Sequence, residues 1–413
     1  MFRKYLLFPT LLLGMLFFTQ CQETEPELPD PSPVVNYSCD EEPTACELIQ
    51  ANNKFGFNIF KKLHEEAPSE NIFISPLSIS TALSMTLNGA DGDTKTEMHN
   101  TLELGDLSLE EVNNAYQYVL TALPELDDDT DLKLANSIWH DIDFSAYSDF
   151  LDVNTDFYNS EVAALDFKDP GAVDVINGWA SDNTNGLIDE ILQEIPGSAV
   201  MYLINAIYFK GNWRFPFDPE FTTPADFYVT PGQTVPVERM GYGAEVTLPY
   251  YENELFQAVN LPYGDSTFSM TVFLPKASQS MDAVVNALET EAYDQWINSF
   301  ADKRMNFFMP KFKMEYEKKL NDILISMGMQ QAFDGRANFS KLGPGDLMIS
   351  MVKHDSYIEV DEEGTEAAAV TTVEVVETSV GLFVDLNRPF LFVIRENKTD
   401  SVLFIGKMND PSE

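Results

Sequence analysis

The sequence predicts an α+β fold with large mixed β-sheets, because helical patterns come early in the chain, strand patterns come late, and the two do not alternate regularly. A regular alternation would instead indicate a parallel α/β sheet. The chain has 413 residues, of which 44% are hydrophobic and 12% aromatic, so it can bury a large core. It contains no internal repeat and no linker after residue 46. We therefore expect a single domain over residues 47–413.

The first predicted helix follows Cys46. Apolar residues recur there at every third or fourth position, which places them on one face of a helix. These residues are Leu48, Ala51, Phe55, Ile59 and Leu63.

The second predicted helix begins at Ser75, a residue type that caps helix N-termini, with Pro76 in the first turn. It ends at Asn88, which is followed by Gly89. The residues expected on its buried face are Ile79, Leu83 and Leu87.

Strands are predicted in four later stretches, which are rich in aromatic and β-branched residues and bounded by Gly, Pro or Asp. They cover residues 202–209, 267–274, 305–316 and 382–394. No helical segment separates them at regular intervals, so we expect large sheets rather than βαβ units.

The charge balance excludes one class of partner. The chain carries 25 Lys and Arg against 67 Asp and Glu, which gives a formal net charge of −42. A polyanionic nucleic acid would be repelled, so we expect no nucleic-acid partner. The acidity keeps the molecule dispersed in solution and carries no information about the fold.

The N-terminus has the features of an export signal. Arg3 and Lys4 precede an apolar run over residues 5–18, which is shorter than the ~20 residues that a spanning helix needs. We interpret residues 1–20 as a signal peptide, with an uncleaved membrane anchor as the alternative. The motif Phe-Thr-Gln-Cys that ends at Cys21 resembles the lipobox of bacterial lipoproteins. It implies a lipid anchor at Cys21 on the bacterial outer membrane or cell surface, and ordinary secretion is the alternative.

Residues 21–46 are predicted to form an acidic, proline-containing tether that cannot build a core. Cys39 and Cys46 lie in its last part. In an exported protein, two cysteines separated by an acidic turn are candidates for a local disulfide. Two free thiols are the alternative, because spacing does not determine bridge geometry.

No metal site and no cofactor are expected, because no cysteine or histidine spacing suits zinc. The four histidines are scattered: His64, His99, His140 and His354. The acidic residues 127–131 have the composition of a calcium loop, but Leu132 stands where that loop needs glycine, and the closing glutamate is missing. We expect a solvated turn there.

Sequence signatures of enzymes are missing. The chain has no Gly-x-Ser-x-Gly elbow, no His-Glu-x-x-His pair and no Gly-x-x-x-x-Gly-Lys loop. We therefore predict that the protein is not an enzyme. Catalytic triads can be assembled from residues far apart in sequence, so an exported hydrolase is an alternative of a different class.

The most informative stretch lies between Asp361 and Val380. Gly364 can act as a pivot because it lacks the Cβ that restricts backbone rotation, and residues 365–380 contain neither proline nor glycine. Alternate residues of a strand share a face. One face would carry Thr365, Ala367, Ala369, Thr371, Val373 and Val375, and the other Glu366, Ala368, Val370, Thr372, Glu374 and Val376. The stretch is therefore suited to insert into a sheet, and an ordinary amphipathic strand is the alternative.

Other motifs surround this stretch in a fixed order. They are residues 73–79 (Phe-Ile-Ser-Pro-Leu-Ser-Ile), 176–179 with Thr184 and Gly186, 203–213, His354 seven residues before Asp361, and 387–390 (Asn-Arg-Pro-Phe). Together they resemble the serpin family from about residue 47 to Pro411. The resemblance implies the serpin fold, with large mixed β-sheets, surrounding helices and an exposed reactive-centre loop over about residues 362–384.

The resemblance also implies roles for individual residues. The loop hinge would comprise Glu362, Glu363, Gly364, Thr365, Ala367, Ala368 and Ala369. The shutter and breach, where the main sheet must part, would contain Ser75, Ser78, Asn205, Trp213 and His354. Counting at the family's spacing from Gly364, or back from Pro389, places the reactive bond between Thr378 and Ser379.

What the resemblance implies about function is irreversible inhibition of serine proteases by a suicide substrate. The protease would cleave the loop, become trapped as an acyl-enzyme, and the loop would insert into the main sheet. Thr378 is small, which implies elastase-like or subtilisin-like targets, with cysteine proteases as a further class. Cleavage after Glu377 would suit a glutamyl-specific protease, and cleavage after Val376 would suit elastase.

A serpin that binds or carries a ligand without inhibiting is the first alternative. Such members generally have bulky, charged or proline residues in the hinge, whereas Thr365, Ala367, Ala368 and Ala369 are all small. We further expect a monomer whose only membrane contact is the lipid anchor at Cys21.

Overall fold

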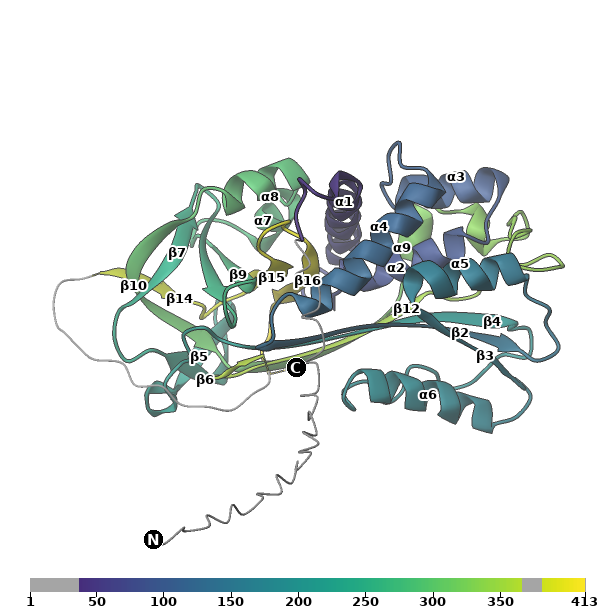
Figure 1. Cartoon of the computed structure of the whole chain (residues 1–413). Helices are drawn as coiled ribbons and strands as arrows, with labels where there is room; N and C mark the ends of the chain where they lie inside the picture. Colours follow the sequence, from purple (N-terminus) through teal and green to yellow (C-terminus); the bar gives the residue numbers. More distant parts are fainter. Residues whose placement is uncertain (1–36, 366–380, 413) are drawn as a thin grey trace, which may run out of the picture. The chain divides into compact units, whose positions relative to one another are not determined.

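The computed structural model describes residues 37–365 and 381–412 (Figure 1). Outside the described residues lie the predicted signal peptide, Cys21, the hinge residues Ala367, Ala368 and Ala369, and the predicted reactive bond Thr378–Ser379. The described part has an α+β fold, as the sequence predicts.

The segment before the first helix is packed onto the domain. Helix α1 (Pro43–Glu66) begins before Cys46, and its predicted apolar stripe is buried. Tyr37 is buried and stacks on Tyr118. Cys39 and Cys46 form a disulfide, so of the two alternatives the structure has the bridge. The end of the predicted tether is therefore fixed to the folded part.

Helix α2 (Pro76–Leu87) has the bounds that its sequence predicts. The Ser75 hydroxyl accepts a hydrogen bond from the Ser78 backbone N–H at 3.2 Å, which is the expected N-cap. The remaining helices are α3 (Gly92–Thr101), α4 (Leu109–Ala122), α5 (Ser148–Tyr158), α6 (Gly171–Asn183), α7 (Met281–Asn286), α8 (Thr290–Ile297) and α9 (Asn321–Ser326), with 3-10 turns η1 (Leu123–Glu125), η2 (Pro219–Phe221) and η3 (Gln331–Phe333).

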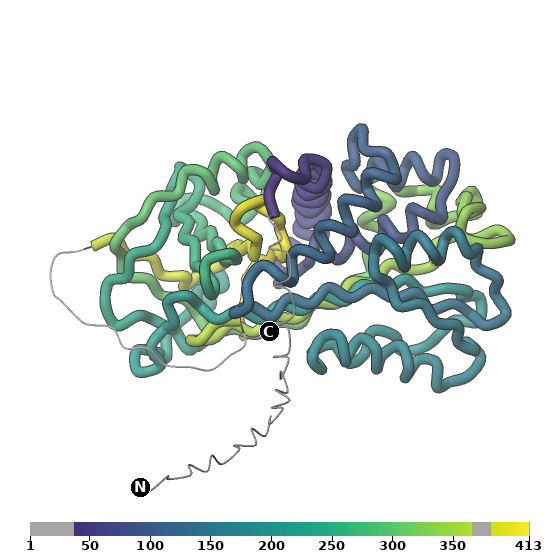
Figure 2. Tube along the Cα trace, viewed as in Figure 1, coloured from purple at the N-terminus to yellow at the C-terminus, as the bar shows by residue number. Residues whose placement is uncertain are grey.

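The largest sheet holds ten strands. Its order is β1 (Ile72–Ile74), β16 (Val402–Met408), β15 (Phe390–Glu396), β9 (Phe268–Pro275), β8 (Phe256–Pro262), β7 (Val246–Glu252), β10 (Ala301–Pro310), β6 (Gln233–Gly241) and β5 (Thr223–Thr230), with β14 (Leu382–Asp385) parallel to β10. Figure 2 shows the purple α1 beside the yellow C-terminal strands. The side-chain amide of Asn53 on α1 fixes this contact. Its Nδ2 donates a hydrogen bond to the Asp400 carbonyl oxygen at 2.8 Å, and its Oδ1 accepts one from the Val402 backbone N–H at 3.0 Å.

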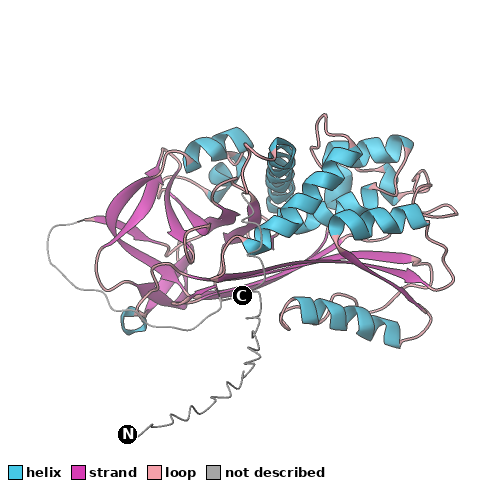
Figure 3. Ribbon diagram, in the orientation of Figure 1, coloured by secondary structure: helices cyan, strands magenta, loops and turns pink. Residues whose placement is uncertain are grey.

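Two smaller sheets lie beside each other without being joined. One has the order β13 (Gly364–Thr365), β4 (Met201–Asn212), β2 (Thr130–Asp141) and β3 (Ser160–Leu165), and the other pairs β11 (Phe312–Lys319) with β12 (Lys353–Val360). Helices cover both faces of β2–β3–β4, with α6 alone on one of them (Figures 1 and 3). Trp179 of α6 packs there against Trp139 and Ile204.

Two of the four predicted strands are each divided in the structure. Residues 305–316 belong to β10 and β11, which separate after Pro310 and join different sheets. Residues 382–394 belong to β14 and β15, and Pro389 directly precedes β15. Proline lacks the N–H that a ladder needs, so it marks the strand ends that the composition alone did not separate.

Within the described ranges, no helix combines the length and the apolar character that crossing a bilayer requires.

Candidate functional site

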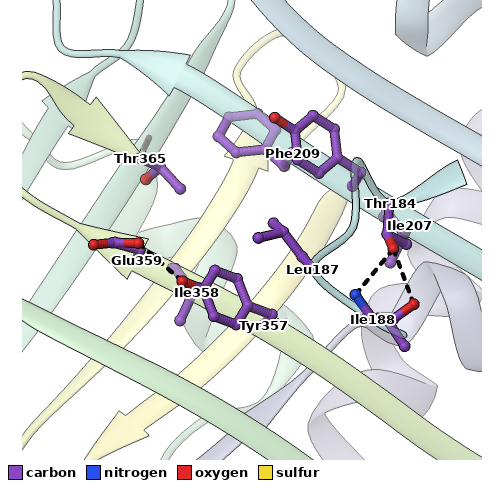
Figure 4. Close-up of a pocket in the computed structure, with 10 residues that line it drawn as sticks. Thr184, Leu187, Ile188, Ile207, Phe209, Tyr357, Ile358, Glu359 and Thr365 are labelled. Atoms are coloured by element: carbon purple, nitrogen blue, oxygen red, sulfur yellow. Dashed lines mark hydrogen bonds between the residues drawn. The ribbon is translucent and has the colours of Figure 1, made fainter. Parts of the chain in front are cut away.

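A slot lies between β4 and β12, which belong to different sheets. Two cavities occupy it, one of about 10 Å³ next to Thr365 and one of about 400 Å³ that extends to His354. We call this space the slot; its strand walls are residues 201–209 of β4 and residues 353–355 and 357–359 of β12. In Figure 4, Leu187, from the segment after α6, lies between Phe209 of β4 and Tyr357 of β12.

The short strand β13 closes one end of the slot. It pairs antiparallel with β4, with Gly364 opposite Asn212 and Thr365 opposite Gly211. Thr365 is buried and is the last described residue before the gap in the described chain. Residues 364 and 365 are therefore already paired to the edge of β4 that borders the slot.

Gly364 is required by close packing. A Cβ placed on it would lie 2.1 Å from the carbonyl oxygen of Gly211 and 2.8 Å from Cα of Asn212, both of which are backbone atoms. Backbone cannot move aside as a flexible side chain can, so only glycine permits this approach. The residue that the sequence suggests as a pivot is thus also the point where β13 meets β4.

Two aromatic side chains, Trp213 and Tyr263, hold Thr365 and the turn before it in place. The indole ring of Trp213 stacks on Tyr263 with ring centroids 4.4 Å apart. The Tyr263 hydroxyl bonds the Thr365 hydroxyl at 2.8 Å, and burial raises the pKa of Tyr263, so it remains a neutral phenol. Trp213 also donates its indole N–H to Asp361 O at 3.0 Å and its backbone N–H to Glu363 O at 2.8 Å. The predicted breach tryptophan therefore clamps the turn that precedes β13.

Glu362 is a buried carboxylate with two partners. Lys311 and the Thr222 hydroxyl each donate a hydrogen bond to it at 2.7 Å. Burial raises the pKa of Glu362, but these bonds outweigh burial and leave the pKa below its usual value. Together with Trp213, this ion pair anchors the hinge. The predicted loop of residues 362–384 thus has both ends in sheets, since residues 382–384 belong to β14.

The predicted shutter residues meet at the other end of the slot. The Ser75 backbone N–H donates to His354 Nε2 at 3.1 Å, and Ser75 in turn caps α2 through Ser78. Ser78, Asn205 and His354 all line the larger cavity. Asn205 has a different partner, because its amide nitrogen donates to Asn136 Oδ1 on β2 at 2.7 Å. Ser75, Ser78 and His354 therefore form one hydrogen-bonded group, and Asn205 faces it from β4.

His354 is neutral in the folded protein, because burial lowers its pKa to about 3. An unfolded histidine has a pKa near 6.5. Between these values the unfolded chain binds a proton that the folded chain does not, so the free energy of unfolding falls as the pH falls from about 6.5 towards 3. The neutral ring also leaves Nε2 free to accept the Ser75 N–H.

We expect His354→Gln to remove this part of the pH dependence. A glutamine oxygen can still accept the Ser75 N–H but does not titrate. Between pH 7.5 and 5, the parent should lose about 2 kcal/mol more free energy of unfolding than the variant, measured by denaturant titration. Equal losses in both proteins would contradict the assignment of a neutral, buried His354.

The acidic turn at residues 127–131 has a structural role. Asp127 is buried rather than solvated, which corrects the expectation for this residue. Its carboxylate accepts hydrogen bonds from Asp129 N–H at 2.9 Å and the Thr130 hydroxyl at 2.8 Å. Across the described ranges, no group of three or more His, Cys, Asp or Glu could hold a metal ion.

Sequence reasoning did not find three residues of the hinge. Tyr263, Lys311 and Thr222 lie 102, 51 and 140 residues from the groups that they contact. Their own neighbourhoods in the sequence carry no motif that points to the hinge. Only the packing of the sheets brings them to it.

Comparisons with known proteins agree on one family. The family model described as "Serpin (serine protease inhibitor)" matches residues 50–411. Serpin A3-1 of Bos taurus is 33% identical over 89% of this chain and 90% of its own, and human alpha-1-antichymotrypsin is 32% identical over 89% and 88%.

Solved structures show the same architecture. Human thyroxine-binding globulin in complex with its ligand superimposes with a TM-score of 0.83 at 29% identity, over 90% of this chain and 100% of that one. Tengpin, a thermophilic serpin in its native state, superimposes with a TM-score of 0.80 at 36% identity, over 88% of this chain and 94% of that one. The family model spans nearly all of the described residues, and the observed fold agrees with it. The chain belongs to the serpin family and has the α+β serpin fold.

Proposed function

We propose that this serpin is an irreversible suicide-substrate inhibitor of serine proteases. The observation that carries the proposal is β13, which is paired to β4 at the mouth of a slot that has strands on both sides. After cleavage, the residues that follow Thr365 would continue the pairing that β13 begins. No catalytic residue of the chain is needed, because the protease supplies the nucleophile.

The register of β13 predicts where the inserted residues would lie. In an antiparallel pair the sum of opposed residue numbers is constant. Gly364 opposite Asn212 and Thr365 opposite Gly211 therefore predict Ala367 opposite Phe209, Ala369 opposite Ile207 and Thr371 opposite Asn205. Thr371 would then arrive beside Asn205 Oδ1, a buried acceptor that has no partner among the described residues.

The composition of the stretch supports burial on insertion. The face that would follow Thr365 inward contains only alanine, threonine and valine up to residue 375. New ladder hydrogen bonds at ~1 kcal/mol each and buried methylenes at ~0.8 kcal/mol each would together exceed ~10 kcal/mol. This rivals the stability of a whole domain, so it could distort an enzyme that is still joined to the loop.

The proposed reactive bond is Thr378–Ser379: the nucleophile of the protease would attack the Thr378 carbonyl carbon and form an ester with it, while the bond to Ser379 breaks and frees the Ser379 amine. A small residue there suits elastase-like or subtilisin-like serine proteases. Cleavage after Val376 would suit the same group, and cleavage after Glu377 would suit a glutamyl-specific enzyme. Cysteine proteases attack by the same acyl chemistry and are a further class to test.

The test is to incubate the purified chain with a panel of serine and cysteine proteases. We expect a complex with an elastase-like or subtilisin-like protease that survives denaturing electrophoresis. Mass spectrometry of the released C-terminal peptide should place the cut between residues 376 and 379. Complete cleavage without complex, for every protease in the panel, would contradict inhibition.

A non-inhibitory binding protein is the second candidate, because the fold is similar to that of thyroxine-binding globulin, whose solved structure is a complex with its ligand. We favour inhibition because a small, uncharged residue already occupies the first inserted position. An exported hydrolase would turn over small ester or peptide substrates, and we expect no turnover.

We further propose that residues 1–20 are removed on export and that a lipid on Cys21 anchors the protein to the membrane, with residues 21–46 as the tether. Intact-mass measurement of the membrane-associated protein tests this. An N-terminus other than a diacylated Cys21 would favour plain secretion.

A further inference from the structure

The larger cavity of the slot has the size of a small-molecule site. Its volume of about 400 Å³ falls within the about 300–1,000 Å³ of typical ligand pockets. Its walls include Ile79 and Leu83 of α2, Leu203 of β4, and the methionines Met348 and Met351. The two methionines are 57% and 41% exposed, so an apolar surface continues from the cavity to solvent. Methionine side chains adapt to the shape of a ligand.

Two polar atoms in this wall have no partner among the described residues. They are Asn205 Oδ1 and Asp355 Oδ2, and both are buried. The Asp355 side chain is only 10% exposed, and its other oxygen pairs with Lys353 at 3.0 Å. A buried acceptor without a donor costs about 1–3 kcal/mol, and more if it is charged. A hydrogen-bond donor brought by a ligand would remove this penalty.

The charges around the cavity favour a cation. Asp346 and Asp355 line the cavity. The ammonium group of Lys353 also lines it, but it already pairs with Glu317 and donates a hydrogen bond to the Ile191 carbonyl oxygen. His354 is neutral, as described above. Burial raises the pKa of Asp355 to about 6 although Lys353 opposes this, so its charge is under-compensated. The chain as a whole is strongly acidic, which attracts cations and repels anions.

We propose that this cavity binds a small amphiphilic amine. The apolar body would lie among Ile79, Leu83 and the methionines, and the ammonium group would donate to the free oxygen of Asp355. Asn205 Oδ1 would accept a further donor from a ligand that carries one. If the proposed inhibitory function holds, such a ligand occupies the path of the inserting loop and antagonises complex formation.

The test uses three probes with one apolar body: 4-phenylbutylamine, 4-phenylbutanol and 4-phenylbutyrate. Binding to the intact full chain is measured by isothermal titration calorimetry at pH 7.5, without a protease. We expect the amine to bind at least about tenfold more tightly than the alcohol, and the carboxylate to bind more weakly than both. Equal affinities, or no binding of the amine, would overturn the proposal.

Two variants and a control locate the site. Asp355→Asn should weaken amine binding about tenfold and change alcohol binding less than twofold. Ala82→Phe fills the cavity from α2 and should abolish binding of all three probes. The control is Glu359→Gln on the same strand, which lies outside this cavity and should bind like the parent. Amine binding that survives both Asp355→Asn and Ala82→Phe would overturn the site.

A separate measurement addresses antagonism. Saturating amine should lower the yield of denaturant-resistant complex with a protease that the parent inhibits, and should leave the yield of the Ala82→Phe variant unchanged. Because calorimetry needs no protease, binding without inhibition of any protease would refute the proposed function and leave the ligand site standing.

Discussion

Replacing Thr365 by arginine is expected to convert the protein from an inhibitor into a substrate that the protease cleaves and releases. Thr365 is buried between β4 and β12, and its hydroxyl bonds Tyr263. A guanidinium group at this position would replace a hydroxyl whose partner is the neutral phenol of Tyr263, and burying an unpaired charge costs several kcal/mol. The arginine would keep the first residue of the loop outside the sheet, so insertion would be slower than hydrolysis of the acyl-enzyme.

Thr365→Val is the matched control. Valine has nearly the same shape, and it removes only the hydroxyl that bonds Tyr263. We expect the valine variant to form the denaturant-resistant complex like the parent, and the arginine variant to lose at least nine-tenths of it. The yield is measured by electrophoresis after reaction with excess protease. An arginine variant that forms as much complex as the parent would contradict insertion through this position.

Cleavage of the loop is expected to make the protein much more resistant to heat. The insertion energy estimated above exceeds ~10 kcal/mol, and each kcal/mol raises the melting temperature of a large domain by about 2 °C. A protease that is not inhibited, or one removed after cutting, provides the nicked chain. Calorimetry should show a melting temperature at least about 20 °C above that of the intact protein.

The arginine variant again separates two explanations for such a gain. If stabilisation comes from strand insertion, nicked Thr365→Arg should gain less than half as much as the nicked parent. If nicking raised stability merely by relieving strain in the loop, both would gain alike. A parent that melts at the same temperature before and after the cut would rule out the proposed mechanism.

Much of the fold could be predicted from local patterns. Ser75 and Pro76 predict the start of α2, and the bond from Ser78 N to Ser75 Oγ agrees, because capping depends on residues three positions apart. The apolar stripe of α1 is also predictable, because it depends on residues three and four positions apart. The division of residues 305–316 into β10 and β11 was missed, although Pro310 was visible, because composition does not say which sheet a strand joins.

The candidate site was predicted in part. Gly364, Trp213, Ser75 and His354 stand in motifs that a family resemblance identifies from sequence. The residues that hold the hinge were not found, because the ion pair of Lys311 with Glu362 joins segments whose proximity depends on the packing of three sheets.

The helical stripes, the alternation after Gly364 that suits insertion into a sheet, and the family all follow from the order of the residues. Folding was needed to show that Thr365 is already paired to β4, that β4 and β12 stand apart with a cavity between them, and that two acceptors there have no partner among the described residues. The reason is physical: periodicity is set by residues a few positions apart, whereas strand partners and cavities are set by segments that are distant in the chain and meet only after folding.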